Sequence, residues 1–380
     1  MKRIEFFFDY SCPYAYLASR QIEALAARAG ASLEWKPFLL GGVFRALALP
    51  QVLPLSPAKA RYLLNDQAAR ARQLGLPLRH PIEHPRRTVS ALRATLARDN
   101  DPALIHAFYR AYWEEGRAIE DEAVVREIAG EVDLESQRET LRLNTEEAIR
   151  RGVFGAPACF VGEQLYWGED RLWMVEAALG GESPSPAAPV NGGRTLDFFF
   201  DFSSPFAYLA STQVETLARR TGATLRLRPI LLGAIFRAVG QVDVPIAAMS
   251  EAKRQYTLLD LGRWAAHWGV PLTWPPAFPL RTVLPLRLFL LEPTVERMSR
   301  LFHAAWAEGR DIGDPAVLRD LRFTEAELQA TNEQKQALVD STQAAIDAGV
   351  FGAPSFLVDG QDLCWGQDRL ARVEGLLRGG

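Results

Sequence analysis

Cysteine is scarce in this chain of 380 residues, which has only three, and histidine is scarce too, with five. Cys12, Cys159 and Cys364 are too few and too far apart for a disulfide framework, and no two have C-x-x-C spacing. No histidine pattern accompanies them to complete a zinc site. His80 and His84 are close in sequence, but a proline follows each and breaks any shared helical face. We therefore expect no bound metal.

An excess of charge of either sign and a long hydrophobic run are also lacking. Lys and Arg total 43 against 46 Asp and Glu, a net charge of −3, which argues against a nucleic-acid partner. No run approaches the roughly 18–20 apolar residues that cross a membrane. The apolar run near the start is flanked by Glu5 and Asp9 and is too short for a signal peptide. We expect a soluble, cytoplasmic protein with no membrane or nucleic-acid partner.

The most informative feature present is a repeat of domain size. FFDYSCPYAYLA at 7–18 returns as FFDFSSPFAYLA at 199–210, and GVFGAP at 152–157 returns at 349–354. With 48% hydrophobic residues, the chain can fill two cores. A stretch rich in Gly, Pro and Ser at 181–193 has the composition of a tether. The sequence therefore predicts a first domain at 1–180, a linker at 181–193 and a second domain at 194–380.

Each half gives the same order of predicted elements. A short strand (3–8, 195–200) leads into a helix that begins near Pro13 or Pro205 and ends at Gly30 or Gly222. A second strand follows, then a long block with helical spacing (41–150, 233–347), a strand pair, and a closing helix (168–179, 366–377). This order predicts an α/β fold with two tandem thioredoxin-like domains, each with an all-helical insertion.

The turn from the first strand to the first helix has a pattern suited to holding an anion. It reads Ser-Cys-Pro-Tyr at 11–14 and Ser-Ser-Pro-Phe at 203–206. A side chain just ahead of a helix lies near unpaired N–H groups and the positive end of the helix dipole, which stabilise a thiolate. The alternative is an ordinary helix cap, for which serine is a favoured residue.

Two further motifs recur late in each half. In Phe-Gly-Ala-Pro, at 154–157 and 351–354, the X-Pro bond is either cis, with backbone groups that face a peptide-like ligand, or trans at the start of an edge strand. In Trp-Gly-x-Asp-Arg-Leu, at 167–172 and 365–370, the aspartate falls in the first turn of the closing helix. There it either caps the helix or binds the ammonium group of a ligand.

These motifs, in this order along nearly the whole of each half, resemble 2-hydroxychromene-2-carboxylate isomerase and the kappa-class glutathione transferases, which are related to DsbA. The resemblance implies an enzyme that uses glutathione, or an analogous small thiol, as its cofactor. The thiolate would add to a conjugated enone of a small aromatic substrate, a carbon–carbon bond would rotate, and the thiolate would leave.

In the second half the resemblance implies that Ser204 stabilises the thiolate and that Ala353 and Pro354 form the peptide-binding turn. Gln367 and Asp368 would meet the γ-glutamyl group. Gln241 stands near the position where the family usually has asparagine. Lys253 and Arg254, near Tyr256, are candidates to hold a carboxylate, with a solvated helix face as the alternative.

The first half departs from this pattern. It has Cys12 at the position of Ser204 and the apolar Leu49 near that of Gln241. The corresponding turns are Ala156 with Pro157 and Glu169 with Asp170. Cys12 matches the nucleophilic cysteine of DsbA-like proteins, but Ala15 stands where its resolving partner would be, so an intramolecular dithiol cycle is excluded.

We therefore predict a working isomerase or transferase site in the second half and an altered site in the first. The two halves are expected to pair as an intramolecular pseudo-dimer, because their fusion raises their effective concentration. The aromatic residues of the second insertion suit either an aromatic substrate pocket or a core. One alternative function is a DsbA-like thiol oxidoreductase built on Cys12, and another is a thiol- or peptide-binding module without catalysis.

Overall fold

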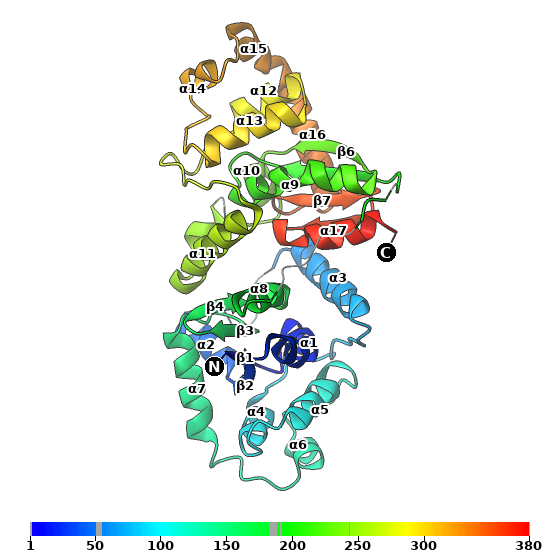
Figure 1. The fold of residues 1–380 in the computed structure, drawn as a ribbon, viewed down its shortest axis with the longest axis vertical. Coiled ribbons are helices and arrows are strands. Elements are labelled where there is room, and N and C mark those ends of the chain that lie inside the picture. The colour runs from blue at the N-terminus through cyan, green and yellow to red at the C-terminus, as the bar shows by residue number, and fades with distance from the viewer. Residues whose placement is uncertain (1, 51–54, 182–187, 191, 243, 380) are drawn as a thin grey trace. The chain divides into compact units, whose positions relative to one another are not determined.

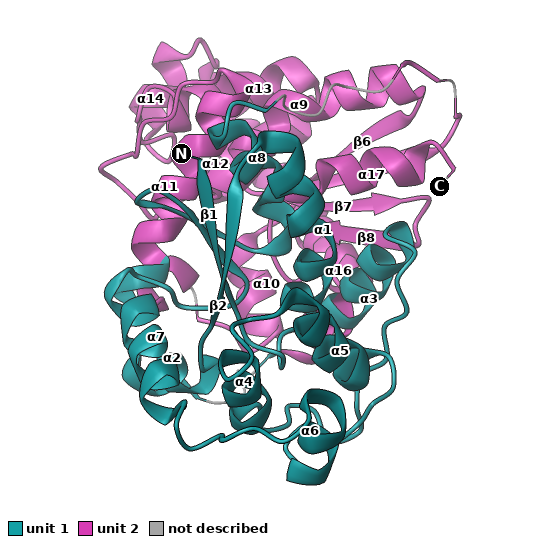
Figure 2. Cartoon of the chain, turned by 60° about the horizontal axis from the view of Figure 1, so that its bottom comes forward, with its two compact units in different colours: residues 1–55, 63–186, 250–253 teal, residues 56–62, 187–249, 254–380 magenta. Residues whose placement is uncertain are grey.

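The computed structural model describes residues 2–50, 55–181, 188–190, 192–242 and 244–379 (Figure 1). The predicted linker at 181–193 therefore falls largely outside the described residues, at 182–187 and 191. The chain divides into two compact units, which are described separately (Figure 2). Unit 1 comprises Met1–Leu55, Leu63–Pro186 and Ser250–Lys253, and unit 2 comprises Ser56–Tyr62, Ala187–Met249 and Arg254–Gly380.

Each half holds a four-stranded mixed sheet of the same topology. The strands of the first are β1 (Arg3–Phe8), β2 (Ser32–Pro37), β3 (Ala158–Val161) and β4 (Gln164–Trp167), in the order β2-β1-β3-β4. Those of the second are β5 (Thr195–Phe200), β6 (Thr224–Pro229), β7 (Ser355–Val358) and β8 (Asp362–Trp365), in the order β6-β5-β7-β8. In both sheets the first two strands are parallel and the remaining pairings are antiparallel.

Helices connect these strands in the predicted order. Those of the first half are α1 (Pro13–Ala29), α2 (Leu40–Ala46), α3 (Pro57–Gln73), α4 (Val89–Leu96), α5 (Pro102–Trp113), α6 (Glu122–Ala129), α7 (Arg138–Arg150), η1 (Glu169–Arg171) and α8 (Leu172–Ala178). Those of the second are α9 (Pro205–Thr221), α10 (Leu232–Ala238), η2 (Pro245–Ala248), α11 (Glu251–Trp268), α12 (Val283–Leu291), α13 (Val295–Trp306), α14 (Pro315–Asp320), α15 (Glu325–Ala330), η3 (Thr331–Gln334), α16 (Lys335–Asp347), η4 (Gln367–Arg369) and α17 (Leu370–Leu377).

The predicted helix signals act where the sequence places them. Pro13 and Pro205 are the first residues of α1 and α9, where a missing N–H costs no hydrogen bond. Gly30 and Gly222 end these helices in the left-handed conformation, with φ of 59° and 64°. The predicted α/β architecture, with the same sheet and a helical insertion in each half, is thus confirmed.

The first strand of each half is buried on both faces because helices cover both sides of the sheet. Phe8 packs against Tyr109 of α5, with ring centroids 5.9 Å apart. Phe7 points to the opposite face, where its ring lies 5.8 Å from the guanidinium of Arg151, the residue after α7. Because both faces are buried, consecutive residues of the strand are apolar, as in the FFF sequence at 6–8.

One tryptophan of each insertion belongs to the core beneath the site. The indole nitrogen of Trp306 donates to the carbonyl oxygen of Phe202 at 2.8 Å, and that of Trp113 donates to Tyr10 at the same distance. Both side chains are fully buried. The aromatic residues of the second insertion were predicted to line either a substrate pocket or the core, and Trp306 belongs to the core.

The closing helix differs from its prediction in one respect. The expected ranges 168–179 and 366–377 each begin with a short 3-10 turn, and the α-helices start only at Leu172 and Leu370. Gly168 and Gly366 have φ of 107° and 105°, so the chain makes a turn there that other residues rarely adopt. This turn separates the strand from the helix and places the aspartate of the motif in the 3-10 segment.

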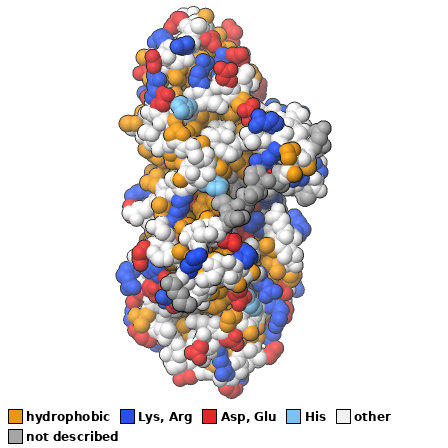
Figure 3. All heavy atoms as spheres, viewed as in Figure 1, with side chains coloured by type: hydrophobic (Ala, Val, Ile, Leu, Met, Phe, Trp, Pro, Cys, Tyr) orange, Lys and Arg blue, Asp and Glu red, His pale blue; other side chains and the backbone are white. Residues whose placement is uncertain are grey.

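The described part of the chain contains no helix that is both long and apolar enough to cross a membrane. On the face seen in Figure 3, basic and acidic side chains lie interspersed.

Candidate functional site

Ser204 occupies the residue before helix α9 and is buried, with 4% of its surface exposed. Its hydroxyl accepts a hydrogen bond from the Ala207 N–H at 3.1 Å and donates one to the Ala353 carbonyl oxygen at 3.0 Å. Ser204 is thus a helix cap, as one alternative held, and it also touches the Ala-Pro turn. The structure brings two of the predicted motifs together at one hydroxyl.

Cys12 has the same place ahead of α1 and the same neighbour. Its thiol donates to the Ala156 carbonyl oxygen at 3.0 Å, but its side chain makes no capping hydrogen bond. Burial raises the pKa of Cys12 to about 12, although N–H groups of the first helical turn oppose that shift. The thiol is therefore protonated at neutral pH, unlike the nucleophile that the DsbA-like alternative requires.

The peptide bonds before Pro157 and Pro354 are both cis. We expected the residue ahead of a cis proline to turn both of its backbone groups towards a ligand. The carbonyl groups of Ala156 and Ala353 instead accept hydrogen bonds from Cys12 and Ser204. The reason is that each turn lies against the residue that precedes the first helix of its half.

The Trp-Gly-x-Asp turns are tightly built. A Cβ atom on Gly352 would lie 2.6 Å from the indole nitrogen of Trp365, so only glycine fits beneath that ring. A Cβ atom on Gly366 would collide with the carboxylate of Asp368. Asp368 lies inside η4, two residues before α17 begins at Leu370, and Arg369 lies 3.7 Å from its carboxylate.

The two turns differ at the residue before the aspartate. In the first half this is Glu169, a buried carboxylate that accepts hydrogen bonds from Gln21 at 2.7 Å and from both Nε and Nη2 of Arg70, at 3.0 and 2.6 Å. In the second half it is Gln367, which is equally buried but carries no charge. A bidentate ion pair therefore occupies the first turn, and a neutral amide occupies the second.

Gln241 follows α10, and its backbone N–H closes that helix by donating to the Phe236 carbonyl oxygen at 2.7 Å. Leu49 does the same after α2, with a hydrogen bond of 2.8 Å to Phe44. Within the described residues, no hydrogen bond joins the Gln241 side chain to Ser204. Its assignment to the site thus still rests on the resemblance.

Lys253 lies elsewhere than the sequence suggested. Its position in the sequence makes it a candidate for the second site, but residues 250–253 group with unit 1, and the Lys253 ammonium lies 5.8 Å from the ring centre of Trp167. The side chain is half-buried, and burial lowers the pKa of Lys253. Lys253 therefore accompanies the Trp-Gly-Glu-Asp turn of the first half.

Two residues that no sequence motif indicated accompany the other turn, Lys59 and Tyr62. The Lys59 ammonium lies 5.2 Å from the ring centre of Trp365. The Tyr62 hydroxyl accepts from the Trp365 N–H at 3.1 Å, and its ring contacts Phe351, with centroids 5.4 Å apart. The missed signal was a lysine three residues before a tyrosine, which occurs at 59 and 62 as well as at 253 and 256.

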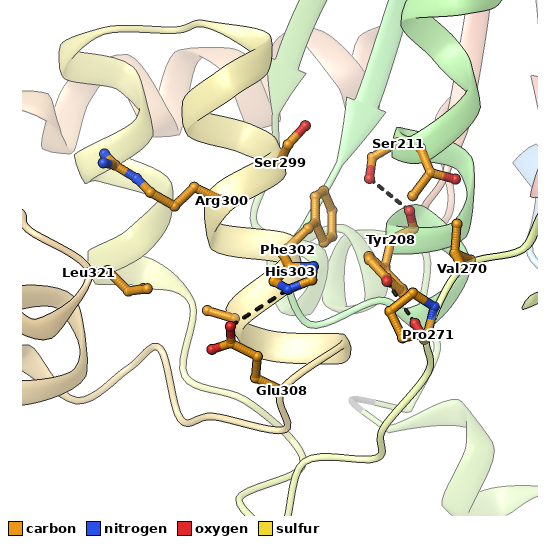
Figure 4. Close-up of a pocket in the computed structure, with 12 residues that line it drawn as sticks. Tyr208, Ser211, Val270, Pro271, Ser299, Arg300, Phe302, His303, Glu308 and Leu321 are labelled. Carbon is orange, nitrogen blue, oxygen red and sulfur yellow. Dashed lines mark hydrogen bonds and ion pairs between the residues drawn. The ribbon is translucent and has the colours of Figure 1, made fainter.

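A separate hollow of about 440 Å³ lies in unit 2 (Figure 4). Its walls come from α9, α13 and the loop at 270–271, and include Tyr208, Pro271 and His303. His303 and Glu308 lie next to each other in its lining, with the nitrogen and oxygen 3.6 Å apart (Figure 4). Neither Ser204 nor the Ala-Pro and Trp-Gly-x-Asp turns line this hollow, so it is distinct from the candidate site.

Comparison with known proteins places the chain in a family. Residues 3–180 and 195–378 each match the model of the DSBA-like thioredoxin domain. The chain is 34% identical over 194 residues to the 2-hydroxychromene-2-carboxylate isomerase of Sphingobium xenophagum, a match that covers 48% of this chain and 98% of that protein. It is 27% identical over 207 residues to glutathione S-transferase kappa 1 of Caenorhabditis elegans, covering 48% of this chain and 90% of that protein.

A solved structure of selenomethionine-labelled 2-hydroxychromene-2-carboxylate isomerase is 29% identical, with a TM-score of 0.43, and covers 48% of this chain and 94% of that one. The curated relatives are enzymes, and each corresponds to about half of this chain. The chain therefore belongs to the family of DSBA-like thioredoxin domains, carries that domain twice, and is related to the 2-hydroxychromene-2-carboxylate isomerases and the kappa-class glutathione transferases.

Proposed function

We propose that the second half binds glutathione, or an analogous small thiol, and uses it to isomerise a small aromatic substrate. The observation that carries this proposal is the hydroxyl of Ser204, which lies at the N-terminus of α9 and contacts the Ala-Pro turn 3.0 Å away. The isomerase and transferase relatives support the choice of thiol chemistry.

The hydrogen bonds of Ser204 define what a ligand must do to bind. A hydroxyl has one proton to donate, and here it goes to the Ala353 carbonyl. A bound thiolate would take that proton in place of the carbonyl, while Ala207 continues to donate to the hydroxyl oxygen. The Ala353 carbonyl would then accept an amide N–H of the same ligand, as an added strand does. Sulfur and amide recognition are thereby linked.

The other end of the thiol would lie at the Trp-Gly-Gln-Asp turn. Asp368 would pair with the ammonium of a γ-glutamyl group, and Gln367 and nearby N–H groups would hold its carboxylate. Lys59, over Trp365, supplies a positive charge for a further carboxylate. Gln241 is assigned to the site by the resemblance alone.

The reaction conserves the thiol. The thiolate donates an electron pair to the conjugated carbon of the enone and forms a carbon–sulfur bond, while the double-bond electrons move to the carbonyl oxygen. The former double bond is then single and rotates. Return of the electrons breaks the carbon–sulfur bond and releases the thiolate and the isomerised product. Hydrogen bonding by Ser204 holds the leaving sulfur as an anion.

The first half is proposed to be an altered copy. Its thiol at Cys12 is buried and protonated, and the Arg70–Glu169 ion pair occupies its Trp-Gly-Glu-Asp turn. These features count against the oxidoreductase alternative, and a binding module without catalysis remains the competing function. A cytoplasmic location and pairing of the two halves stay predictions from the sequence.

Ser204→Ala tests the proposal. We expect the variant to bind glutathione but to raise the pKa of the bound thiol and to lower kcat by about 10–100-fold, because a hydrogen bond to the sulfur anion is lost. Calorimetry, thiolate absorbance and turnover of a ring-opened aromatic pyruvate measure these effects. Ser211→Ala is the matched control, since Ser211 is a buried hydroxyl of the same helix that donates to the Tyr208 carbonyl. No binding of glutathione or of other small thiols to the wild type at millimolar concentration would refute the proposal.

A further inference from the structure

We propose that Asp201 is a positioning residue of the thiol site. Its carboxylate joins the turn that contains Ser204 to the beginnings of helices α10 and α12. This inference rests on the proposed function of the second half. It concerns a buried acid that does not contact the thiol in that mechanism.

The carboxylate of Asp201 joins three segments of unit 2. One oxygen accepts hydrogen bonds from the backbone N–H and the hydroxyl of Ser203, at 2.9 and 3.0 Å. The other accepts from the N–H of Leu232, the first residue of α10, at 2.8 Å. Thr282, immediately before α12, donates its hydroxyl to the same carboxylate.

The backbone of Asp201 contacts the catalytic turn directly. Its carbonyl oxygen accepts from the Ser204 N–H at 3.0 Å. Ser203 and Ser204 are therefore both held by the one residue that also holds the beginning of the helical insertion. A change in this contact would move the Ser204 hydroxyl relative to Ala353, which is 3.0 Å away. A misplacement of about 1 Å at a catalytic group can lower a rate by about 100-fold.

The carboxylate lies in a costly position. Asp201 is 1% exposed, and burial raises its pKa although its hydrogen bonds oppose the shift. A buried acid of this kind is strongly destabilising unless its oxygens are satisfied, and here four donors satisfy them. The four donors explain how a buried carboxylate is tolerated. Their hydrogen bonds also define the position of the turn.

The first half repeats this arrangement and supplies a control. Asp9 accepts from the N–H and hydroxyl of Ser11, both at 2.9 Å, and from the N–H of Leu40 at 2.8 Å, while Thr88 donates as Thr282 does. The geometry is the same, but the turn that Asp9 holds carries Cys12. The two acids thus share a role in stability and differ in whether a working site depends on it.

The direction in which the pKa of the bound thiol changes distinguishes a positioning role of Asp201 from a direct effect of its charge. A negative charge near the bound sulfur opposes its ionisation, so removal of the Asp201 charge alone would lower the pKa of the bound thiol. Loss of the Ser204 position would raise that pKa, because the hydrogen bond to the thiolate weakens. In Asp201→Asn the amide NH₂ group also faces donors, which displaces the turn.

The experiment compares Asp201→Asn with Asp9→Asn in the full chain. Both variants are expected to lose thermal stability to a similar extent. Only Asp201→Asn should raise the pKa of bound glutathione, by about one unit, which corresponds to about tenfold less thiolate at a pH below that pKa. An unchanged or lowered thiol pKa in Asp201→Asn, or an equal rise in Asp9→Asn, would overturn the inference.

Milder variants keep the test decisive if Asp201→Asn does not fold. Thr282→Val removes one donor with little change of shape, and Thr88→Val is its counterpart. Thr282→Val should raise the thiol pKa by a smaller amount, and no rise would contradict the positioning role. Failure of the proposed function is distinguishable, since the wild type would then bind no glutathione at all.

Discussion

At the scale of single residues, Ser204 and Cys12 occupy equivalent positions and differ in one side-chain atom, oxygen against sulfur. Each precedes a helix and donates to the carbonyl of an Ala-Pro turn at 3.0 Å. The oxygen of Ser204 also accepts an N–H of its helix, whereas the sulfur of Cys12 makes no such bond. We infer that the serine can hold another molecule's thiolate, and that the cysteine is itself a protonated thiol within the core.

The Cys12 thiol should therefore be unreactive in the folded protein. Its pKa of about 12 leaves little thiolate at neutral pH, and Cys159 and Cys364 are also buried. Titration with a chromogenic disulfide reagent is expected to modify almost no thiol at pH 7 and all three after unfolding. Reactivity should increase only as the pH approaches the pKa of Cys12. A fast thiol in the native protein that disappears in Cys12→Ser would contradict this assignment.

Which residues form the site was predictable only where the signal is local. The residue before Pro205 can be assigned from the helix signal around it. The hydrogen bond from Ser204 to Ala353 and the Arg70–Glu169 ion pair cannot, because each joins residues about a hundred or more positions apart. Their partners are determined by tertiary packing, which a single sequence does not record.

At the scale of elements, strands and helices followed their hydrophobic patterns closely, and the exception is the closing helix. The pattern alone predicted one continuous helix from residue 366, while the positive φ of Gly366 delays the α-helix to Leu370. The sequence places Lys253 in the second half, whereas the structure groups residues 250–253 with unit 1. Secondary structure does not determine which unit the end of a helix joins.

The pairing of α9 with α17 should depend on pH through Glu374. Its carboxylate accepts from Arg220 and Arg378, each with a hydrogen bond of 3.0 Å from Nε. Burial alone would raise the pKa of Glu374, but the two guanidinium groups outweigh it and lower the pKa below the usual value. A depressed pKa in the folded state adds stability above the unfolded-state pKa, and this stability is lost as the pH falls through the folded-state pKa.

Glu374→Gln is accordingly expected to lower the free energy of unfolding by about 1–2 kcal/mol at pH 7 and by much less at pH values below the folded-state pKa. Denaturant unfolding at both conditions measures the difference. The control is Glu176→Gln in the first half, where the partner Arg28 is 60% exposed and the effect should be smaller. A loss that grows at acid pH would contradict the sign of the shift.

At the scale of the whole molecule, the chain carries one fold twice with two different sites. The repeat and the order of its elements made the fold predictable, because each strand and helix is indicated twice, once in each half. The comparison of the halves also predicted the asymmetry at Cys12 and Ser204. It did not predict the second asymmetry, the charged pair at Glu169 against the neutral Gln367, which depends on a contact with α3.

Calorimetry of glutathione binding to Asp368→Ala and Asp170→Ala tests most directly whether the second half is the working one. The two aspartates occupy equivalent positions, in the 3-10 turns η4 and η1, and each lies next to an arginine. We predict that Asp368→Ala weakens binding by about tenfold or more, the cost of one charge-assisted contact, and that Asp170→Ala weakens it less. The opposite ranking would show that the thiol is bound by the first half.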